Sequence, residues 1–183
     1  MALVYGGTAL AQTQIPINEP LQKFHRYIGA GISAPTGLLE DAGRRGFHCW
    51  SRVGYFLTAN TEVIAGPEYH TFDRDNLGQF GTSGGRFYTI MLGVGVKYNL
   101  GRDRERRNPY VFAGAGWAFL EVLPLTTLEE GTRRFNSAEG IYLEGGLGVS
   151  LDWIFLQAKI VRVAKRYIGD RLTFFPFSIG LRF

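Results

Sequence analysis

The last eleven residues of the chain, Thr173 to Phe183, alternate two kinds of side chain at every second position. One set contains threonine, phenylalanine, isoleucine and leucine, and the other contains one phenylalanine together with proline, serine, glycine and arginine. A period of two places the two sets on opposite faces of an extended strand. An apolar face backed by a mixed face is typical of a strand with lipid on one side and a packed polar interior on the other.

The chain of 183 residues is long enough for one domain with a sizeable core. Its longest uncharged apolar runs, 87–96 and 110–120, reach only about ten residues, whereas a membrane-spanning helix needs about twenty. A tilted membrane strand needs only about nine to eleven residues. If the chain crosses a bilayer, strands must cross it. They must also close into a barrel, because an open edge leaves unpaired backbone groups in hydrocarbon.

The same alternation recurs along the chain in segments separated by turn-forming or polar stretches. Apolar residues return at every second position and not at every third and fourth, which argues against helices. The connections are mostly long after odd-numbered segments and shorter after even-numbered ones, as in a barrel with both termini on one side. The sequence therefore predicts an all-β fold, an eight-stranded antiparallel up-and-down transmembrane β-barrel. The predicted strands are 25–34, 46–57, 61–72, 86–100, 110–121, 141–151, 154–165 and 173–183.

A soluble lipocalin-like barrel also has eight alternating strands, with the apolar face turned inward around a ligand. The face opposite the apolar one is here rich in glycine and carries only isolated charges, too few to coat a water-facing exterior. The sequence therefore favours the membrane barrel. Within the seventh segment, residues 161–163 invert the expected polarity, which predicts a bulge or the exit from the bilayer at that point.

The first 22 residues are set apart from the barrel. Ala9 to Gln12 follow a short apolar stretch and resemble the small-residue cleavage site of a secretory signal, although no basic segment precedes them. A disordered tail is the alternative, and Pro16 and Pro20 also argue against a strand here. We interpret 1–22 as an N-terminal tail or signal-peptide remnant and 23–183 as the transmembrane β-barrel domain.

An eight-stranded barrel has an interior just wide enough for its own side chains, so charged groups inside it need partners. The faces predicted to point inward carry both signs of charge, which indicates a network of salt bridges and hydrogen bonds that fills the lumen. A gated proton or ion path through the same charges is the alternative. The predicted lumen charge network comprises Arg52, Glu68, His70, Lys97, Glu144, Lys159 and Arg182.

Aromatic side chains at both ends of an apolar band favour the two membrane interfaces. The segment 86–100 shows this pattern, with a tyrosine at each end of its outward-facing aliphatic ladder. Other aromatic residues occupy corresponding positions at the ends of further segments. The predicted interfacial anchors are Tyr88, Tyr98, Tyr110, Trp117, Trp153 and Phe183.

Composition excludes several kinds of site. The single cysteine, Cys49, rules out an internal disulfide and a thiolate-rich metal site. The net charge of +4 and the isoelectric point near 9.3 come from arginines grouped in expected loops, without a basic helix or a water-facing aromatic surface. We therefore expect no nucleic-acid partner, no metal and no organic cofactor.

Four stretches together carry a resemblance to a known family: GVGVKYNLG (93–101), NPYVFAGAGWA (108–118), GGLGVSLDW (145–153) and the carboxy-terminal strand. Their order and spacing resemble those of the small, porin-like OmpA/OmpX-type outer-membrane β-barrel proteins over residues 24–183. The resemblance implies the outer membrane of a Gram-negative-type bacterium, with membrane lipids and lipopolysaccharide as neighbours. In that family the aromatic end of the last strand is similar to the signal read by the barrel-assembly machinery, which implies this role for Phe183.

The same resemblance implies a structural, scaffold or surface-interaction role in the cell envelope. The predicted loops 35–45, 73–85 and 122–140 could contact an envelope protein partner. A narrow ion or small-solute channel is one alternative, and a lipid-modifying enzyme of the lipid A deacylase kind is another. The deacylase pattern pairs a histidine with a serine two residues later, whereas Phe72 follows His70 at that spacing. We therefore expect no enzymatic activity.

Overall fold

The computed structural model describes residues 24–36, 43–74, 85–101, 107–123, 136–167 and 170–183. Every predicted strand coincides with one observed strand, and the ends differ by five residues at most. The predicted N-terminal tail lies outside the described residues. The strands are β1 (Phe24–Thr36), β2 (Gly43–Phe56), β3 (Thr61–Arg74), β4 (Gly85–Asn99), β5 (Arg107–Leu123), β6 (Asn136–Leu151), β7 (Ile154–Tyr167) and β8 (Asp170–Arg182).

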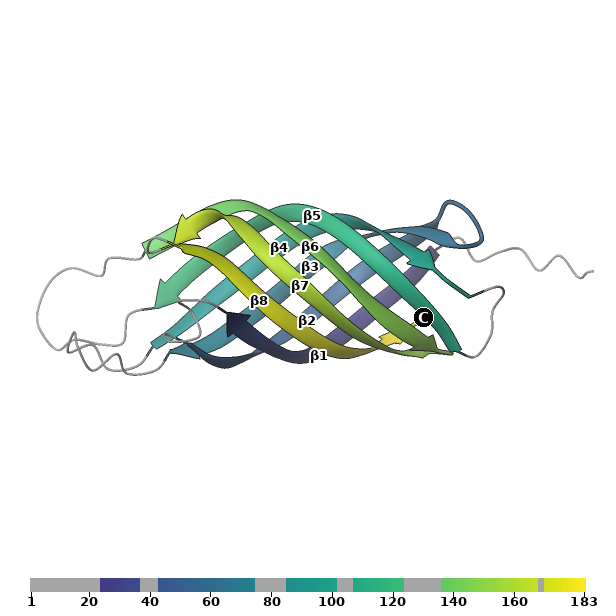
Figure 1. Cartoon of the computed structure of the whole chain (residues 1–183), viewed down its shortest axis with the longest axis horizontal. Coiled ribbons are helices and arrows are strands. Elements are labelled where there is room, and N and C mark those ends of the chain that lie inside the picture. The colour runs from purple at the N-terminus through teal and green to yellow at the C-terminus, as the bar shows by residue number, and fades with distance from the viewer. Residues whose placement is uncertain (1–23, 37–42, 75–84, 102–106, 124–135, 168–169) are drawn as a thin grey trace, which may run out of the picture.

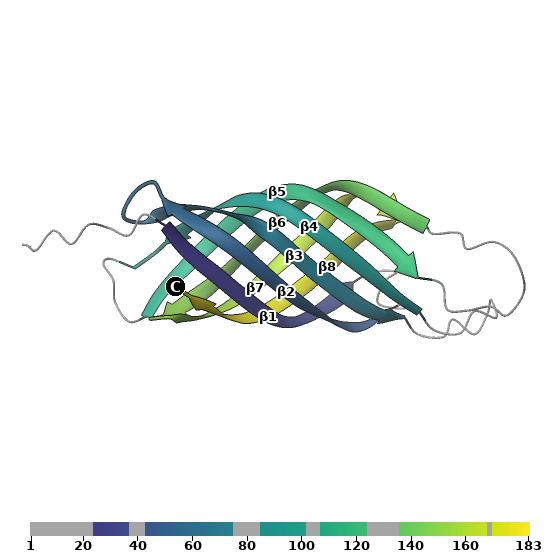
Figure 2. The ribbon, with the colours of Figure 1, turned by 180° about the vertical axis from the view of Figure 1, so that it is seen from behind.

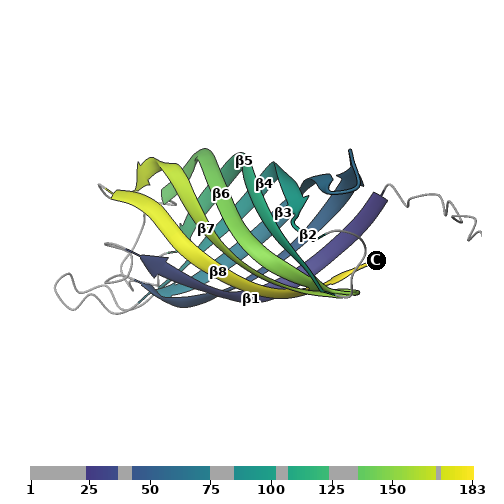
Figure 3. The same cartoon turned by 45° about the vertical axis from the view of Figure 1, so that its right-hand side comes forward.

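The eight strands form a closed antiparallel barrel in which each strand pairs with its neighbours along the chain (Figures 1 and 2). The barrel closes where β1 pairs with β8, from Tyr27 opposite Arg182 to Thr36 opposite Thr173. Figure 3 shows these two strands side by side and strongly tilted. The start of β1 and the end of β8 lie at the same end of the barrel, which we call the terminus end; the other end is the loop end. Among the described residues, no helix is long and apolar enough to span a membrane.

Side chains alternate between the lumen and the exterior as the period of two predicted. On β4, Ile90, Leu92 and Val94 are 54%, 59% and 55% exposed, whereas the intervening Met91 is fully buried. The apolar face therefore points outward. A lipocalin-like barrel requires the opposite arrangement, so this alternative is wrong.

Several aromatic residues of the outer face lie toward the two ends of the outward apolar band, whereas Trp117 is paired with Leu92 near the middle of β4. At the terminus end, Phe24 packs against Tyr55, with ring centroids 4.9 Å apart. Toward the loop end, Tyr69 stacks on Tyr88 at 5.9 Å. Five of the six predicted anchors have side chains on the outer surface or at the barrel end: Tyr88, Tyr98, Trp117, Trp153 and Phe183.

The sixth predicted anchor, Tyr110, points into the lumen, so its assignment to the interface is wrong. Its side chain is 3% exposed, and its ring lies over Gly148 on β6, where an added Cβ would approach the ring to 2.4 Å. The hydroxyl group donates to Gln157 Oε1 at 3.3 Å. The reason for the error is that β5 is apolar on both faces, because Tyr110 and Phe112 point inward and Val111 points outward.

The irregularity predicted in the seventh segment occurs. The pairing of β7 with β8 shifts register between Arg162 and Arg166. The in–out alternation itself continues through this region, with Val161 and Val163 buried and Arg162 exposed. The polarity inverts because the lumen is apolar at that depth, and not because the strand has turned over.

The turn between β6 and β7 contains only Asp152 and Trp153, as the sequence predicted. Asp152 has a φ of 57°, the one left-handed non-glycine residue among those described. A single left-handed residue at the first turn position fits a type II′ hairpin, which prefers glycine there. The Asp152 carbonyl accepts a hydrogen bond from Arg182 Nη2 at 2.9 Å.

Asp152→Gly is expected to raise the free energy of unfolding by up to about 1 kcal/mol, because glycine adopts this conformation without a steric penalty. The backbone acceptor for Arg182 is retained in this variant. Asp152→Val is expected to lower the free energy of unfolding by about 1–2 kcal/mol. Urea titrations of the refolded barrels in detergent micelles measure both changes. Equal unfolding midpoints for the two variants would contradict the assignment of strain to this residue.

Candidate functional site in the barrel lumen

Two apolar clusters of buried residues fill much of the lumen. The loop-side cluster lies toward the loop end and the terminus-side cluster toward the opposite end. The loop-side cluster comprises Phe72, Phe87, Met91, Ala118, Leu120, Tyr142, Val161, Val163, Leu172 and Phe174. The terminus-side cluster comprises Tyr27, Trp50, Ile64, Tyr110, Phe112 and Phe155. Polar and charged side chains lie near the middle of the strands and again close to the terminus end.

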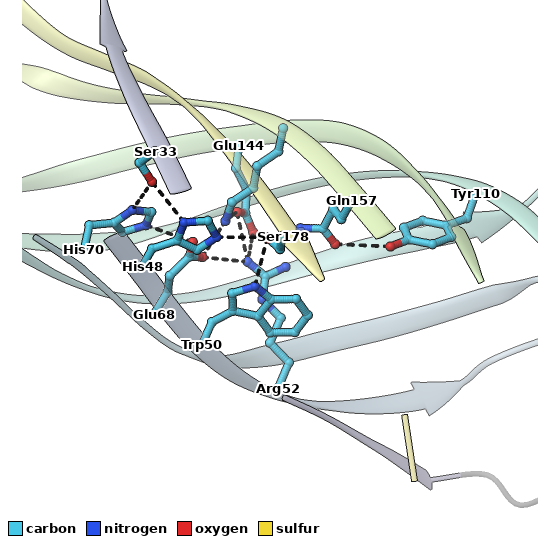
Figure 4. Close-up of polar contacts among 11 residues, drawn as sticks. Ser33, His48, Trp50, Arg52, Glu68, His70, Tyr110, Glu144, Gln157 and Ser178 are labelled. Atoms are coloured by element: carbon cyan, nitrogen blue, oxygen red, sulfur yellow. Dashed lines mark hydrogen bonds and ion pairs between the residues drawn. The ribbon is translucent and has the colours of Figure 1, made fainter. Parts of the chain in front are cut away.

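Four charged side chains from four strands meet near the middle of the barrel, and we call them the central quartet: Arg52, Glu68, Glu144 and Lys159. Figure 4 labels the first three of them. Arg52 Nη2 donates to Glu144 Oε1 at 2.7 Å and to Glu68 Oε2 at 3.2 Å. Lys159 Nζ donates to Glu144 Oε2 at 2.7 Å and also to Glu68 Oε2. Each cation therefore contacts both carboxylates. All four side chains are almost fully buried, so the charges rely on one another and not on water.

A second charged cluster lies closer to the terminus end and comprises Tyr27, Glu62 and Lys97. Lys97 Nζ donates to Glu62 Oε2 at 3.2 Å and to the Tyr27 hydroxyl at 3.1 Å. The same hydroxyl donates to the Glu62 carboxylate at 2.7 Å. Gly54 makes room for this carboxylate, because an added Cβ would lie 1.9 Å from Glu62 Oε1.

Glu62 is missing from the predicted lumen network although it is fully buried. Its position along the strand could have revealed it, because it shares the inward parity of Ile64 and Glu68 on β3. A parity rule applied to the whole strand would have placed it inside.

A group of uncharged polar side chains links the histidines of β2 and β3. Ser33 Oγ lies 3.1 Å from His48 Nδ1 and 3.0 Å from His70 Nδ1. The two imidazole rings are stacked, with centroids 5.1 Å apart. His48 Nε2 lies 2.9 Å from Ser178 Oγ, which also accepts a hydrogen bond from Trp50 Nε1 at 3.3 Å. All of these side chains are buried.

This histidine group touches the central quartet at one point. His70 Nε2 lies 2.8 Å from Glu68 Oε1. The contact is oblique, because the two atoms do not meet hydrogen-bond geometry. The sequence predicted His70 inside the lumen, but it did not indicate that Ser33 and Ser178 reach the histidines from β1 and β8.

The structure brings five of the predicted lumen residues into contact, namely Arg52, Glu68, His70, Glu144 and Lys159. Lys97 is also buried, but it belongs to the separate cluster with Glu62. Arg182 lies beside the second cluster, near enough for its charge to act on Tyr27 and Lys97. It lies at the last position of β8, where its guanidinium reaches the Asp152 carbonyl in an exposed turn.

The space left between the two charged clusters is small. A cavity of about 20 Å³ is lined by Arg52 and Lys97 together with residues of the terminus-side cluster and Gln157. This volume holds about one water molecule. Gln157 Nε2 has no protein partner, which makes it a natural donor to such a water. Within the described ranges, no group of three or more His, Cys, Asp or Glu side chains is placed to hold a metal ion.

Taken together, the outward apolar band, the closed ladder and the filled lumen define the class of small transmembrane β-barrels. Neisserial surface protein A has a similar structure, with a TM-score of 0.60 and 15% identity over 87% of this chain and 96% of that one. Ail, the attachment invasion locus protein of Yersinia pestis, in complex with the heparin analogue sucrose octasulfate, gives a TM-score of 0.55 and 15% identity over 88% and 99%. No protein-family model and no curated protein matches the sequence. The chain has the fold of small outer-membrane β-barrels, as the resemblance predicted.

Glu144→Gln is expected to lower the free energy of unfolding by about 3–5 kcal/mol, because Arg52 and Lys159 then share one carboxylate in a buried site. Glu121→Gln on the exposed outer face of β5 is the matched control, with an expected change of less than about 0.5 kcal/mol. Urea titration in micelles measures both. Adding Lys159→Met to Glu144→Gln restores the balance of charge, so the double variant should lose less than the sum of the single losses. Strict additivity would argue against a coupled quartet.

Proposed function

We propose that this chain is an outer-membrane β-barrel protein of a Gram-negative-type bacterium, with a lumen sealed by side chains and a structural, scaffold or surface-interaction role. The observation that carries the proposal is the distribution of polarity across the barrel wall. Apolar side chains cover most of the outside of the described strands, whereas Arg52, Lys97, Lys159 and three glutamates are buried within. Exposed charges such as Glu121 and Arg162 lie toward the strand ends. Contact of this outer surface with water would be unfavourable, and contiguous apolar patches of this extent are rare on soluble proteins.

Closure of the barrel supports the same location. Every strand has a partner on both sides, so the backbone groups of the wall are satisfied within the barrel and can lie in hydrocarbon. Aromatic side chains toward both ends of the apolar band suit the two interfaces. Membrane lipids and lipopolysaccharide are therefore the proposed neighbours of the outer surface.

The exposed end of β8 supports recognition by the barrel-assembly machinery. Phe183 is 66% exposed, and its backbone N–H donates to the Arg26 carbonyl at 2.9 Å. The terminal aromatic ring is thus held at the outer surface next to the strand pair that closes the barrel. We assign Phe183 the role of an assembly signal on this basis and on the family resemblance.

The filled lumen favours a structural or interactive role over transport. Apolar clusters lie on either side of the central quartet, and the cavity between the charged clusters is no larger than about one water. A narrow channel would require several of these side chains to move together. The quartet is the one feature that favours such a channel as the second candidate, because each of its cations already contacts both carboxylates and could exchange one for the other.

Lipid modification has weaker support. Ser33, His70 and Glu68 do form a line of nucleophile, base and carboxylate, although the sequence indicated no nucleophile for His70 and Glu68. Both Ser33 and His70 are fully buried, however, and the aromatic residues Phe72 and Phe174 contact the His70 ring on the loop side. A lipid ester bond has no path to the hydroxyl in this arrangement. We therefore assign these residues a role in packing and not in catalysis.

Surface interaction would use the connections at the loop end. The predicted partner-binding loops lie mostly in ranges 37–42, 75–84 and 124–135, outside the described residues. The similar structures are those of a Neisserial surface protein and of an attachment invasion locus protein in complex with a heparin analogue. An envelope protein or a surface ligand is accordingly the proposed class of partner, reached through these connections.

Leu92→Arg tests the membrane location, because Leu92 is 59% exposed in the middle of the β4 ladder. A charge near the bilayer midplane is expected to cost about 2–4 kcal/mol of folding stability in lipid vesicles. Leu57→Arg in the turn at the terminus end is equally exposed and should cost less than about 1 kcal/mol. Heat-dependent migration on a detergent gel and urea titration in vesicles report folding. Equal stability of the two variants would place the outer surface of the barrel in water.

Planar-bilayer recordings test the sealed lumen. The wild-type barrel is expected to show no sustained single-channel conductance, because its apolar clusters and central quartet fill the bore. Glu144→Ala removes a partner of two cations but leaves both apolar clusters in place, so it should also remain silent. Reproducible openings in the wild type that change amplitude or frequency in Glu144→Ala would support the channel instead.

A further inference from the structure

The buried polar side chains beside the central quartet form one continuous line across the lumen, which we call the histidine chain. It runs in the order Trp50, Ser178, His48, Ser33, His70 and Glu68 (Figure 4). These residues come from β2, β8, β1 and β3, so the line exists only in the closed barrel. Neither the packing of the quartet nor the sealing of the bore requires two stacked histidines at this place.

The two ends of the histidine chain fix its direction. An indole N–H can only donate, so Ser178 Oγ accepts from Trp50. At the other end, the Glu68 carboxylate is bound by Arg52 and Lys159 and therefore acts as an acceptor. His70 Nε2 lies 2.8 Å from Glu68 Oε1, too obliquely for a hydrogen bond, and the nearby negative charge favours a proton on this nitrogen over a lone pair.

With these ends fixed, each inner group has one assignment that uses every donor and acceptor once. The lone pair of His70 Nδ1 accepts from the Ser33 hydroxyl, whose oxygen accepts from His48 Nδ1–H. The lone pair of His48 Nε2 then accepts from the Ser178 hydroxyl. Both imidazoles are neutral in this arrangement, with His48 protonated at Nδ1 and His70 at Nε2.

We propose that the stacked His48–His70 pair is a buried proton-accepting site that the histidine chain holds neutral at neutral pH, and that protonation of the pair in acid destabilises the barrel. An added proton on His70 Nδ1 removes the acceptor of the Ser33 hydroxyl. An added proton on His48 Nε2 does the same to Ser178. Each protonation therefore breaks the chain at a serine in a site closed to water.

The charges around the pair oppose a net gain of protons. The charged groups that face it are Glu68 from β3, Glu144 from β6 and Lys159 from β7. Arg52 from β2 binds both carboxylates, so the formal charges of the four groups cancel. β1 contributes Ser33 to the surroundings of the pair, and β8 contributes Ser178 and the Phe174 ring. A second proton would place two cations in stacked rings 5.1 Å apart, while Lys159 already competes for Glu68.

The sign of the pH dependence follows from the number of bound protons. In the unfolded chain both histidines take up a proton below about pH 6.5. The folded chain resists this uptake, so the unfolded state binds more protons and stability falls as the pH falls. Between pH 7 and pH 5 the unfolding equilibrium constant should rise about 25-fold for one excluded proton and about 600-fold for two.

The test uses the refolded full chain in detergent micelles, with urea unfolding measured at pH 7, 6 and 5. The wild type should show a rise of more than about 100-fold in the unfolding constant from pH 7 to pH 5. His25→Asn replaces the third histidine, near the terminus end, and should keep this dependence. The double variant His48→Asn with His70→Asn should lose most of it, whatever its stability at pH 7. Equal pH dependence in the wild type and the double variant would overturn the proposal.

A measurement on the wild type alone covers the case in which the double variant does not fold. Nitrogen-15 NMR of histidine-labelled barrel at pH 6.5 should show two neutral side chains of opposite tautomer, protonated at Nδ1 in His48 and at Nε2 in His70. The signals are assigned from single variants of His48 and His70, because each variant lacks the signals of one histidine. A doubly protonated His48 or His70 at that pH, or the same tautomer in both, contradicts the proposed chain.

Discussion

The pairing of β1 with β8 is the constraint on which the rest of the structure depends. It satisfies the backbone groups of two strands that would otherwise be open edges, which hydrocarbon does not tolerate. Closure with eight strands also fixes a narrow bore, so the inward side chains must fill the lumen by themselves. The same closure brings Ser33 of β1 and Ser178 of β8 against the histidines of β2 and β3. The satisfied backbone of the wall and the packing of the lumen therefore both follow from closure of the barrel.

A narrow, closed bore places a strict condition on buried charge. The buried lysine, arginine and glutamate side chains of the described strands comprise three cations and three carboxylates, namely Arg52, Lys97, Lys159, Glu62, Glu68 and Glu144. They divide into two clusters that are each bridged by short contacts and separated by aromatic residues. Balance within the lumen leaves neither sign in excess where water cannot reach. Neutral histidines fit this balance, since any proton they gain is an uncompensated charge.

Most of the fold was predictable from the sequence because a period of two is a property of the single strand. The alternation on β4 and β8 identified strands, faces and the outward direction of the apolar residues. Where both faces of a strand are apolar, as around Tyr110 on β5, the pattern carries no information about direction and the prediction failed. Where a residue with inward parity stands at a strand end, as Arg182 does, parity does not tell its depth along the barrel axis.

The contacts inside the candidate site were less predictable for a geometrical reason. Which inward side chains meet across the bore depends on the tilt and stagger of the strands, and these belong to the closed barrel as a whole. Glu68 meets Lys159 across the lumen although 91 positions separate them in the chain. Charge alone suggested such partners, whereas Ser33 and Ser178 offered no charge and therefore no signal. Their contacts with the histidines form only when β1 pairs with β8.

The layering of the lumen explains why so few polar groups can have a large effect on stability. Apolar clusters on both sides keep water from the central quartet and the histidine chain, which strengthens their contacts relative to the same contacts at a surface. Exclusion of water also removes the solvent that could otherwise accept a displaced hydroxyl hydrogen from Ser33 or Ser178. The aromatic rings that seal the bore are thus the reason that protonation of His48 or His70 is costly. In this barrel, closure to solutes and sensitivity to acid arise from the same packing.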